Sequence, residues 1–536
     1  MIKKDKFILL FLVVLFGIQV IIFYPVNGNF PLNDDWVHSL SIKIFSEKGE
    51  FFYPSFLGPY NLIPTIFGIL LSKFFGFSFL ILKYFNSILS LGCILLFYCF
   101  LRKIKVSIII SLLITLLFLS NPVFFNLSYT FMGDIMALFL IILAIYLYYL
   151  GFEKKKYWMI FLASIVVVLA SFTRQVCFLL FLAAFIFYFF NKRFKRINFL
   201  WVFGVPAIIG LFFYILLNNF GVLPSEISAR FLPEGWSYFE HIIYMLWDYL
   251  LLISLFIVPI TLSLVIKNLG WLKKYLFWFL VVLFFSFAII FKQEGHVFPS
   301  LGNIINFYGL GPNASVMQGS LQTWFGEKFY IILHYILSIL SAINIFIVVQ
   351  FIKIKNKKIK NLNFIWLFLL LYILIVLPIR SFDRYLVLVL PSIFLFSSLI
   401  LKKFKSSKII FILFLFLLLF YSFVGTYNYL AWNKARWALG ERLLKNKGVE
   451  ISEIEGGYEW DGWFLYKKTR EENLGDFTPE WSPWYIKQLF SGHTMKYIIS
   501  FSELGGYKII DKEKVNGIFS NIGYIYLNEV VPYSLK

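Results

Sequence analysis

Long apolar runs divide this 536-residue chain into segments of about membrane-spanning length. A helix needs about 20 predominantly apolar residues to cross the hydrocarbon core of a bilayer. By that measure, membrane-crossing helices are expected at residues 7–25, 79–101, 106–121, 130–150, 199–217, 242–266, 275–291, 328–352 and 408–427. The pattern predicts an all-α polytopic membrane protein.

Two further runs are too long for one crossing. The run 157–190 would measure roughly 50 Å as a single helix, against a core of about 30 Å. Each run is interrupted near its middle, at 171–175 in the first and at 378–384 in the run 364–401. Each is therefore expected to form a helical hairpin, which brings the total to about 13 crossings.

Short basic stretches separate the apolar runs, at residues 3–6, 102–105, 154–156, 192–196, 267–274, 353–360 and 402–408. Basic loops stay on the cytoplasmic side of a membrane, so an even number of crossings must separate consecutive stretches. This rule predicts a cytoplasmic N-terminus and an external C-terminus, and it places the turns of both hairpins outside. It also accounts for the net charge of +21 without nucleic-acid binding.

The composition agrees with a bilayer environment. The chain is 60% hydrophobic and 14% charged, with a mean hydropathy of +0.81, which excludes a soluble globular protein. No small-residue cleavage site follows the first apolar run, so it is expected to be a retained helix. Cys93, Cys99 and Cys177 lie within apolar runs and show no disulfide or metal-binding spacing.

The expected organisation has two parts. Residues 1–427 form the membrane domain, whose first outer loop, 26–78, contains a short apolar segment expected to lie in the interface. Residues 428–536 are more polar and form a small external α/β domain, with a helix at 432–445 and strands at 495–501 and 522–527.

Ionisable residues near helix ends gather on the predicted outer side. Each has an ordinary explanation alone, such as a solvated turn, a helix cap or a snorkelling side chain. Together they match sugar transfer from a lipid phosphate, where a carboxylate deprotonates the acceptor and cations stabilise the departing phosphate. The set is Asp34, Asp35, Lys83, Asp134, Arg174, Arg380, Asp383 and Arg384.

Five short motifs in this order resemble the GT-C glycosyltransferases that use polyprenyl-phosphate sugars, such as protein O-mannosyltransferases and aminoarabinose transferases. They are Asn-Asp-Asp-Trp at 33–36, Phe-Met-Gly-Asp at 131–134, Ser-Phe-Thr-Arg-Gln at 171–175, Gly-Leu-Gly-Pro at 309–312 and Phe-Asp-Arg-Tyr at 382–385. The resemblance implies a GT-C type fold in the bacterial cytoplasmic membrane, with the C-terminal domain in the periplasm or outside the cell.

The resemblance also implies roles. Asp34 would be the catalytic base, with Asp35 orienting the loop or assisting, and Asp134 would contact the acceptor. Whether Asp34 and Asp134 hold a divalent metal ion stays an open question. The lipid phosphate would be held by four cations: Lys83, Arg174, Arg380 and Arg384. The implied partners are a polyprenyl-phosphate-sugar donor in the bilayer and a glycolipid, polysaccharide or protein acceptor.

The chain also departs from the aminoarabinose transferases, which carry Lys-Pro-Pro-Leu where this chain has Tyr-Asn-Leu-Ile-Pro at 60–64. The phosphate-binding lysine of that stretch is missing. Two other classes stay open: a transporter or flippase of a glycolipid, and a structural membrane protein. A transporter would place polar groups near the midplane, often in paired halves, whereas these residues lie at one surface.

Overall fold

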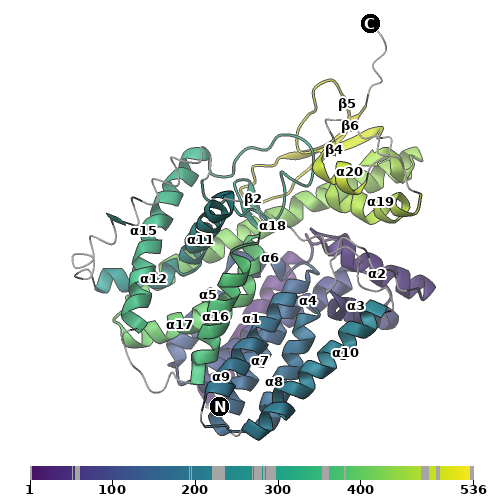
Figure 1. Cartoon of the computed structure of the whole chain (residues 1–536). Coiled ribbons are helices and arrows are strands. Elements are labelled where there is room, and N and C mark those ends of the chain that lie inside the picture. Colours follow the sequence, from purple (N-terminus) through teal and green to yellow (C-terminus); the bar gives the residue numbers. More distant parts are fainter. Residues whose placement is uncertain are drawn as a thin grey trace.

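The computed structural model describes residues 3–50, 52, 54, 61–191, 193–194, 196–219, 236–268, 270, 280–281, 284, 297–352, 361–379, 382–472, 482–490 and 495–530. Most of them are helical, and a small sheet lies towards the C-terminus (Figure 1).

Within this part of the chain, eight helical segments are long and apolar enough to cross a membrane. This finding indicates a membrane-embedded protein. Five of them belong to α1 (Lys3–Phe23), α4 (Phe79–Lys103), α7 (Gly133–Lys154), α15 (Glu327–Ile352) and α18 (Lys408–Lys447). The others are η4 with α10 (Leu200–Gly204, Val205–Asn219), most of α11 (Trp236–Phe256), and η6 with α17 (Asp383–Val389, Leu390–Lys403).

Shorter apolar helices complete the bundle. They are α5 (Ile108–Leu119), α8 (Tyr157–Ser171), η2 with α9 (Gln175–Cys177, Phe178–Phe190), α12 (Val258–Lys267) and α16 (Asn363–Val376). Each of the runs 157–190 and 364–401 contains two helical segments, one on either side of its interruption, as expected for a hairpin. Residues 380 and 381 of the second interruption lie outside the described residues. The expected crossing 275–291 falls almost wholly outside the described residues.

One expected helix is wrong in detail. The run 242–266 was expected to be continuous, but α11 ends at Phe256 and α12 starts at Val258. Pro259 stands in the first turn of α12, where its missing N–H is tolerated. Within a continuous helix the same proline would remove a hydrogen bond and clash with the preceding turn, so the helix breaks just before it.

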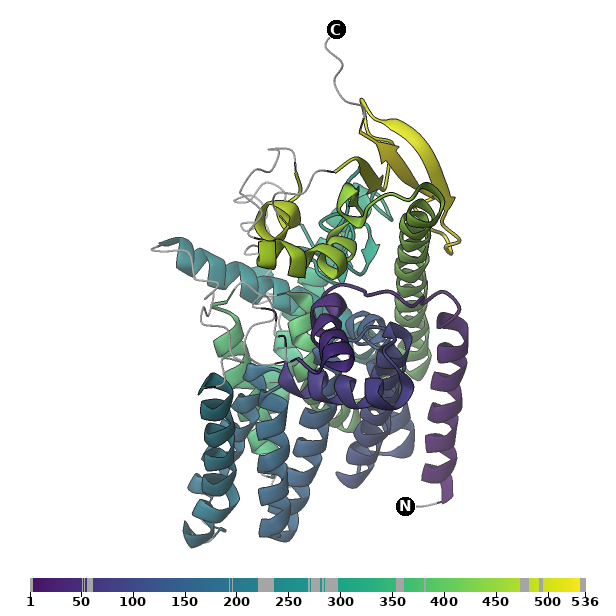
Figure 2. The ribbon, with the colours of Figure 1, turned by 90° about the vertical axis from the view of Figure 1, so that its right-hand side faces the viewer.

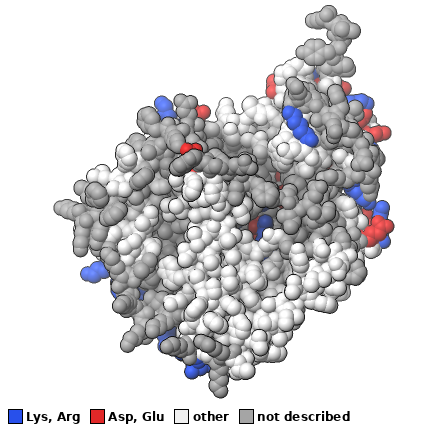
Figure 3. Space-filling model, viewed as in Figure 1, with Lys and Arg blue, Asp and Glu red and all other residues white. Residues whose placement is uncertain are grey.

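Contacts between basic segments place them at one end of the bundle. Arg102 pairs with Asp5 at 2.7 Å, and the Lys402 ammonium donates to the carbonyl of Lys105 at 3.0 Å. Asn268 donates to the carbonyl of Lys405 at 2.9 Å. Segments that are far apart in sequence therefore meet at this end, as the spacing of the basic stretches predicts. Over the bundle itself, Figure 3 shows few charged side chains.

The opposite end of the bundle carries short helices and the C-terminal part of the chain (Figures 1 and 2). Helices α2 (Asp35–Lys48) and α3 (Leu62–Phe75) pack against each other there, and α6 (Pro122–Leu127) lies between α5 and α7. Helix α18 runs without a break through residue 427, where the composition changes, so one helix joins the bundle to the C-terminal part.

The C-terminal part contains the 3-10 turn η7 (Ile451–Glu453), helices α19 (Tyr458–Glu472) and α20 (Trp484–Leu489), and a four-stranded sheet in the order β3-β4-β6-β5. The strands are β3 (Ile454–Glu455), β4 (Tyr497–Ser500), β5 (Lys508–Lys514) and β6 (Tyr524–Glu529). Strand β4 runs parallel to β3 and antiparallel to β6. The strands expected at 495–501 and 522–527 are confirmed as β4 and β6.

The Gly-Leu-Gly motif near residue 310 ties the loop that precedes α15 to α18. The loop forms a small hairpin of β1 (Ile305–Asn306) and β2 (Gly309–Leu310). Gly311 has φ +80°, and a Cβ atom there would lie 2.3 Å from the ring of Tyr429. Only glycine fits this backbone and this contact, so the motif serves close packing between the loop and the helix.

Candidate active site

The site forms around the loop that follows α1. Asn33 adopts φ +53°, a left-handed conformation that asparagine tolerates better than most residues, and turns the chain into α2. Asp34 occupies the N-cap position but makes no capping hydrogen bond through its side chain. Its carboxylate is therefore free to face away from the helix.

The two oxygens of Asp34 are bound from opposite parts of the molecule. Oδ2 accepts a hydrogen bond from Arg384 of η6 at 2.8 Å, and Oδ1 accepts one from the hydroxyl of Tyr458 of α19 at 2.8 Å. Burial alone would raise the pKa of the Asp34 carboxyl, but Arg384 and the Tyr458 hydroxyl hold that pKa below its usual value. Asp34 is thus stabilised as a carboxylate.

The position of Arg384 depends on its neighbour Asp383. The Asp383 carboxylate accepts hydrogen bonds from the backbone N–H groups of Ile304 and Ile305, which belong to the loop before α15, and from that of Arg384. These contacts fix the start of η6 against the loop. The Phe-Asp-Arg-Tyr motif therefore combines an anchoring acid with the arginine that reaches Asp34.

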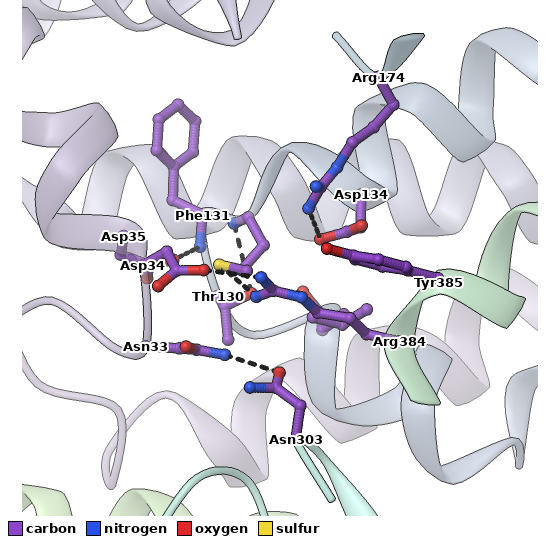
Figure 4. Close-up of polar contacts among 12 residues, drawn as sticks. Asn33, Asp34, Asp35, Thr130, Phe131, Asp134, Arg174, Asn303, Arg384 and Tyr385 are labelled. Atoms are coloured by element: carbon purple, nitrogen blue, oxygen red, sulfur yellow. Dashed lines mark hydrogen bonds and ion pairs between the residues drawn. The ribbon is translucent and has the colours of Figure 1, made fainter. Parts of the chain in front are cut away.

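A second ion pair lies beside the first (Figure 4). Asp134, in the first turn of α7, accepts a hydrogen bond from Arg174 at 2.7 Å. The ring of Tyr385 connects the two pairs, because its centroid lies 5.8 Å from the guanidinium carbon of Arg174 and 6.0 Å from that of Arg384. Four segments distant in sequence thus bring two acids and two arginines together.

Each pair has one buried member and one that is partly open to solvent. The side chains of Arg384 and Asp134 are 8% and 1% exposed, while those of Asp34 and Arg174 are 23% and 21% exposed. A ligand that reaches the site would therefore meet the partly exposed carboxylate of Asp34 and the partly exposed guanidinium of Arg174. Figure 3 shows acidic and basic atoms recessed near the middle of this face, whereas the other charged side chains in view lie towards its edges and its upper part.

Asp35 has a different environment from Asp34. Its side chain is completely buried, and it accepts a hydrogen bond from the backbone N–H of Phe131 at 2.9 Å. Burial raises the pKa of the Asp35 carboxyl to about 7, although the nearby Lys83 opposes this. Lys83 is also fully buried and donates to Asn27 Oδ1 at 2.8 Å and to the Gly28 carbonyl at 3.2 Å. These contacts tie Lys83 to the loop after α1.

The structure brings together Asp34, Asp134, Arg174 and Arg384 from the residues proposed on sequence. Asp35 lies next to Asp34, but its carboxylate is buried and binds the backbone N–H of Phe131. Lys83 binds Asn27 and Gly28 and is not part of the two acid–arginine pairs. Arg380 lies outside the described residues.

Sequence reasoning missed the contribution of the C-terminal part. Glu459 of α19 accepts a hydrogen bond from the backbone N–H of Asn33 at 3.0 Å and pairs with Arg436 of α18 at 2.8 Å, with both charged side chains fully buried. Trp36 packs against Gly462 of α19 so closely that a Cβ atom at residue 462 would lie 2.3 Å from the indole. A possible signal was the acid-rich, aromatic stretch 455–461 that follows α18.

The site residues do not fit a metal centre in this arrangement. Asp34 and Asp134 are each already paired with a guanidinium, so a cation would have to displace an arginine. Among the described residues, no group of three or more His, Cys, Asp or Glu side chains could hold a metal ion. No step proposed below passes through a metal.

Searches of protein-family models, curated proteins and solved structures found no match to this chain.

Proposed function

We propose that this protein is a membrane glycosyltransferase, which moves a sugar from a polyprenyl-phosphate-linked donor to an acceptor on the non-cytoplasmic side. The observation that supports the proposal best is the meeting of two acid–arginine pairs, Asp34–Arg384 and Asp134–Arg174, at one end of an apolar helical bundle. Charged groups are expensive at such depth and are usually functional.

In the proposed reaction, Asp34 removes the proton of an acceptor hydroxyl while the hydroxyl oxygen attacks the anomeric carbon of the donor. The bond between that carbon and the phosphate oxygen breaks with inversion, and the lipid phosphate leaves with the bonding electrons. Arg384 and Arg174 stabilise the phosphate charge, because guanidinium groups bind phosphate oxygens in bidentate geometry. The Asp34–Arg384 contact would loosen when the phosphate arrives, which frees the carboxylate to act as a base.

The proposal includes an orientation. The basic segments at the far end of the bundle would lie in the cytoplasm, so the site would face the periplasm or the exterior. With α11 and α12 counted as one crossing, the described apolar helices of the bundle would make 12 crossings. A further crossing at 275–291 would bring the total to 13 and give the GT-C type topology implied by the sequence motifs. The chain would be a multi-pass protein of the bacterial cytoplasmic membrane.

Replacement of Asp34 by Asn tests the proposal. The variant keeps the size of the side chain and the hydrogen-bond acceptor for Tyr458, but it cannot take up a proton. We expect normal membrane insertion and loss of transfer from a polyprenyl-phosphate sugar. A variant that transfers sugar at the wild-type rate would remove Asp34 from the mechanism.

A further inference from the structure

Asp34 lies between two chemically different surfaces. Its Oδ2 faces the arginines of the bundle, whereas its Oδ1 accepts a hydrogen bond from Tyr458 of the C-terminal part. The arginine side suits a phosphate. The Tyr458 side is aromatic, because the ring of Tyr458 packs against Trp36 and Trp484, at centroid distances of 5.7 Å and 5.5 Å.

Of these three aromatic residues, Trp484 is the one exposed to solvent. It begins α20, and 40% of its surface is exposed, whereas Trp36 and Tyr458 are buried. Its indole is nevertheless held in place, since Nε1 donates to the carbonyl of Ser315 at 2.7 Å and the ring lies at 33° to that of Tyr458. A single tyrosine side chain separates this fixed, open indole from Asp34.

The neighbours of Trp484 fix its helix as well. Tyr485 is buried, and its hydroxyl donates to Glu455 of β3 at 2.7 Å. A large aromatic surface that stays exposed while its orientation is fixed loses little conformational freedom when a ligand binds. An indole held in this way is suited to a ligand that packs against its ring.

The open indole suits a sugar ring. A pyranose presents an apolar face of C–H groups, which packs well on the negative face of an aromatic ring, and a rim of hydroxyls. The polar groups of this surface are already used, because the indole N–H binds Ser315 and the Tyr458 hydroxyl binds Asp34. An extended peptide needs free backbone partners, whereas a sugar ring needs mainly the aromatic face.

We infer that Trp484 forms the open face of the acceptor subsite, with the buried Tyr458 positioning it beside Asp34, and that the acceptor is a saccharide carried on a glycolipid or polysaccharide. The inference rests on the proposed function, because it takes Asp34 as the base that meets the acceptor hydroxyl. A pyranose stacked on Trp484 would extend past Tyr458 and bring one of its hydroxyls to Asp34. The lipid donor would enter from the opposite side, next to Arg384 and Arg174.

Saccharide binding in the absence of donor tests the subsite separately from catalysis. The full-length protein is placed in nanodiscs, and saturation-transfer NMR measures binding of a panel of methyl pyranosides and a Ser/Thr-containing peptide. The variants are Trp484→Ala, Trp484→Phe and Asp34→Asn. The control is Phe519→Ala, which removes an aromatic residue that is 78% exposed elsewhere in the C-terminal part.

We expect Trp484→Ala to weaken pyranoside binding about five- to tenfold, which is the scale of one aromatic contact. Trp484→Phe should keep part of the binding, which shows that the site still folds, and Phe519→Ala should leave binding unchanged. Asp34→Asn should still bind the sugar although it transfers none. If Asp34→Asn transfers sugar while binding still depends on Trp484, Asp34 is not the base and the subsite stands. If the wild-type protein binds pyranosides through Trp484 but transfers no sugar from any polyprenyl-phosphate donor, the proposed function fails and the saccharide site stands.

Three results would overturn the subsite. The first is wild-type protein that binds no pyranoside, and the second is pyranoside binding that is equally strong in Trp484→Ala. The third is a peptide that binds in a Trp484-dependent way while the sugars do not.

Discussion

The buried pair Arg436–Glu459 connects the C-terminal part to the loop of Asp34, and its removal gives a quantitative prediction. Both side chains are 0% exposed, and the Glu459 carboxylate makes two contacts. It pairs with Arg436 and also accepts the backbone N–H of Asn33, next to Asp34. Glu459→Ala therefore leaves a buried guanidinium without its carboxylate and releases the loop.

The expected cost follows from the burial of the pair. Removing one partner of a buried ion pair costs about 3–5 kcal/mol, because an uncompensated charge stays in the interior. Such a loss changes the unfolding equilibrium constant by a factor of about 150 to about 5,000. We expect that decrease in the free energy of unfolding, together with reduced sugar transfer, because Asn33 no longer holds the loop.

Urea unfolding of the purified protein in mixed micelles, followed by tryptophan fluorescence, measures this loss. The matched control is Glu513→Ala, which breaks an Arg–Glu pair of the same 2.8 Å length whose side chains are 38% and 33% exposed. An exposed pair contributes less than about 1 kcal/mol. The double variant Arg436→Met/Glu459→Gln removes both charges and keeps an acceptor for Asn33, so it should recover most of the stability.

The result that refutes this reasoning is a Glu459→Ala variant no less stable than the Glu513→Ala control. A double variant as unstable as Glu459→Ala would also refute it, since the loss could then not come from an unpaired buried charge.

Three further outcomes are expected. Tyr458→Phe removes a hydroxyl that lowers the pKa of Asp34, so the acidic limb of the pH–rate profile for transfer should move to higher pH. An unmoved limb would show that Asp34 does not govern it. Arg174→Gln leaves Asp134 without its guanidinium and should raise the KM for the lipid donor about tenfold or more, with partial recovery in Arg174→Lys. An unchanged donor KM would remove Arg174 from phosphate binding. Burial raises the pKa of Glu455 to about 7. As the pH rises, the Glu455 carboxyl therefore stays protonated in the folded protein at pH values where it is already ionised in the unfolded chain. The free energy of unfolding should therefore fall as pH rises from about 4.5 to about 7, and Glu455→Gln should flatten this fall; an equally steep slope in the variant would contradict the assignment.

Much of the membrane part could be predicted because hydrophobic length and basic loops follow from local composition. The hairpin turns at 171–175 and 378–384 follow from the length of each run and the charges that flank it. The break before Pro259 was also readable in principle, since proline is poorly tolerated inside a helix. The prediction missed this break because it counted only the length of the apolar run, which continues through Pro259.

The sequence predicts on which side of the membrane the site residues lie, but not which of them pair with one another. Counting crossings places Asp34, Asp134, Arg174 and Arg384 at one surface, but it cannot say which acid meets which arginine. It also could not separate Asp34 from Asp35, because one binds Arg384 and the other binds the buried backbone N–H of Phe131. Those contacts depend on how the loop packs around Asn27 and Phe131.

The role of Tyr458 and Glu459 was beyond sequence reasoning for a physical reason. They reach the loop of Asp34 across more than 400 residues of chain, through the continuous helix α18 and the close contact of Gly462 with Trp36. Long-range packing of this kind leaves no local periodicity. An external domain was expected, but its contact with the candidate base was not.

The most direct test of the central claim is sugar transfer in liposomes that contain only the purified protein and a defined polyprenyl-phosphate sugar. Wild-type protein should release the lipid phosphate and form one glycosidic bond per phosphate on a pyranoside acceptor, on the face opposite the basic loops. Asp34→Asn in the same liposomes should give neither product. Movement of the donor across the bilayer with no new glycosidic bond, for every sugar tried, would contradict the account and identify the protein as a transporter.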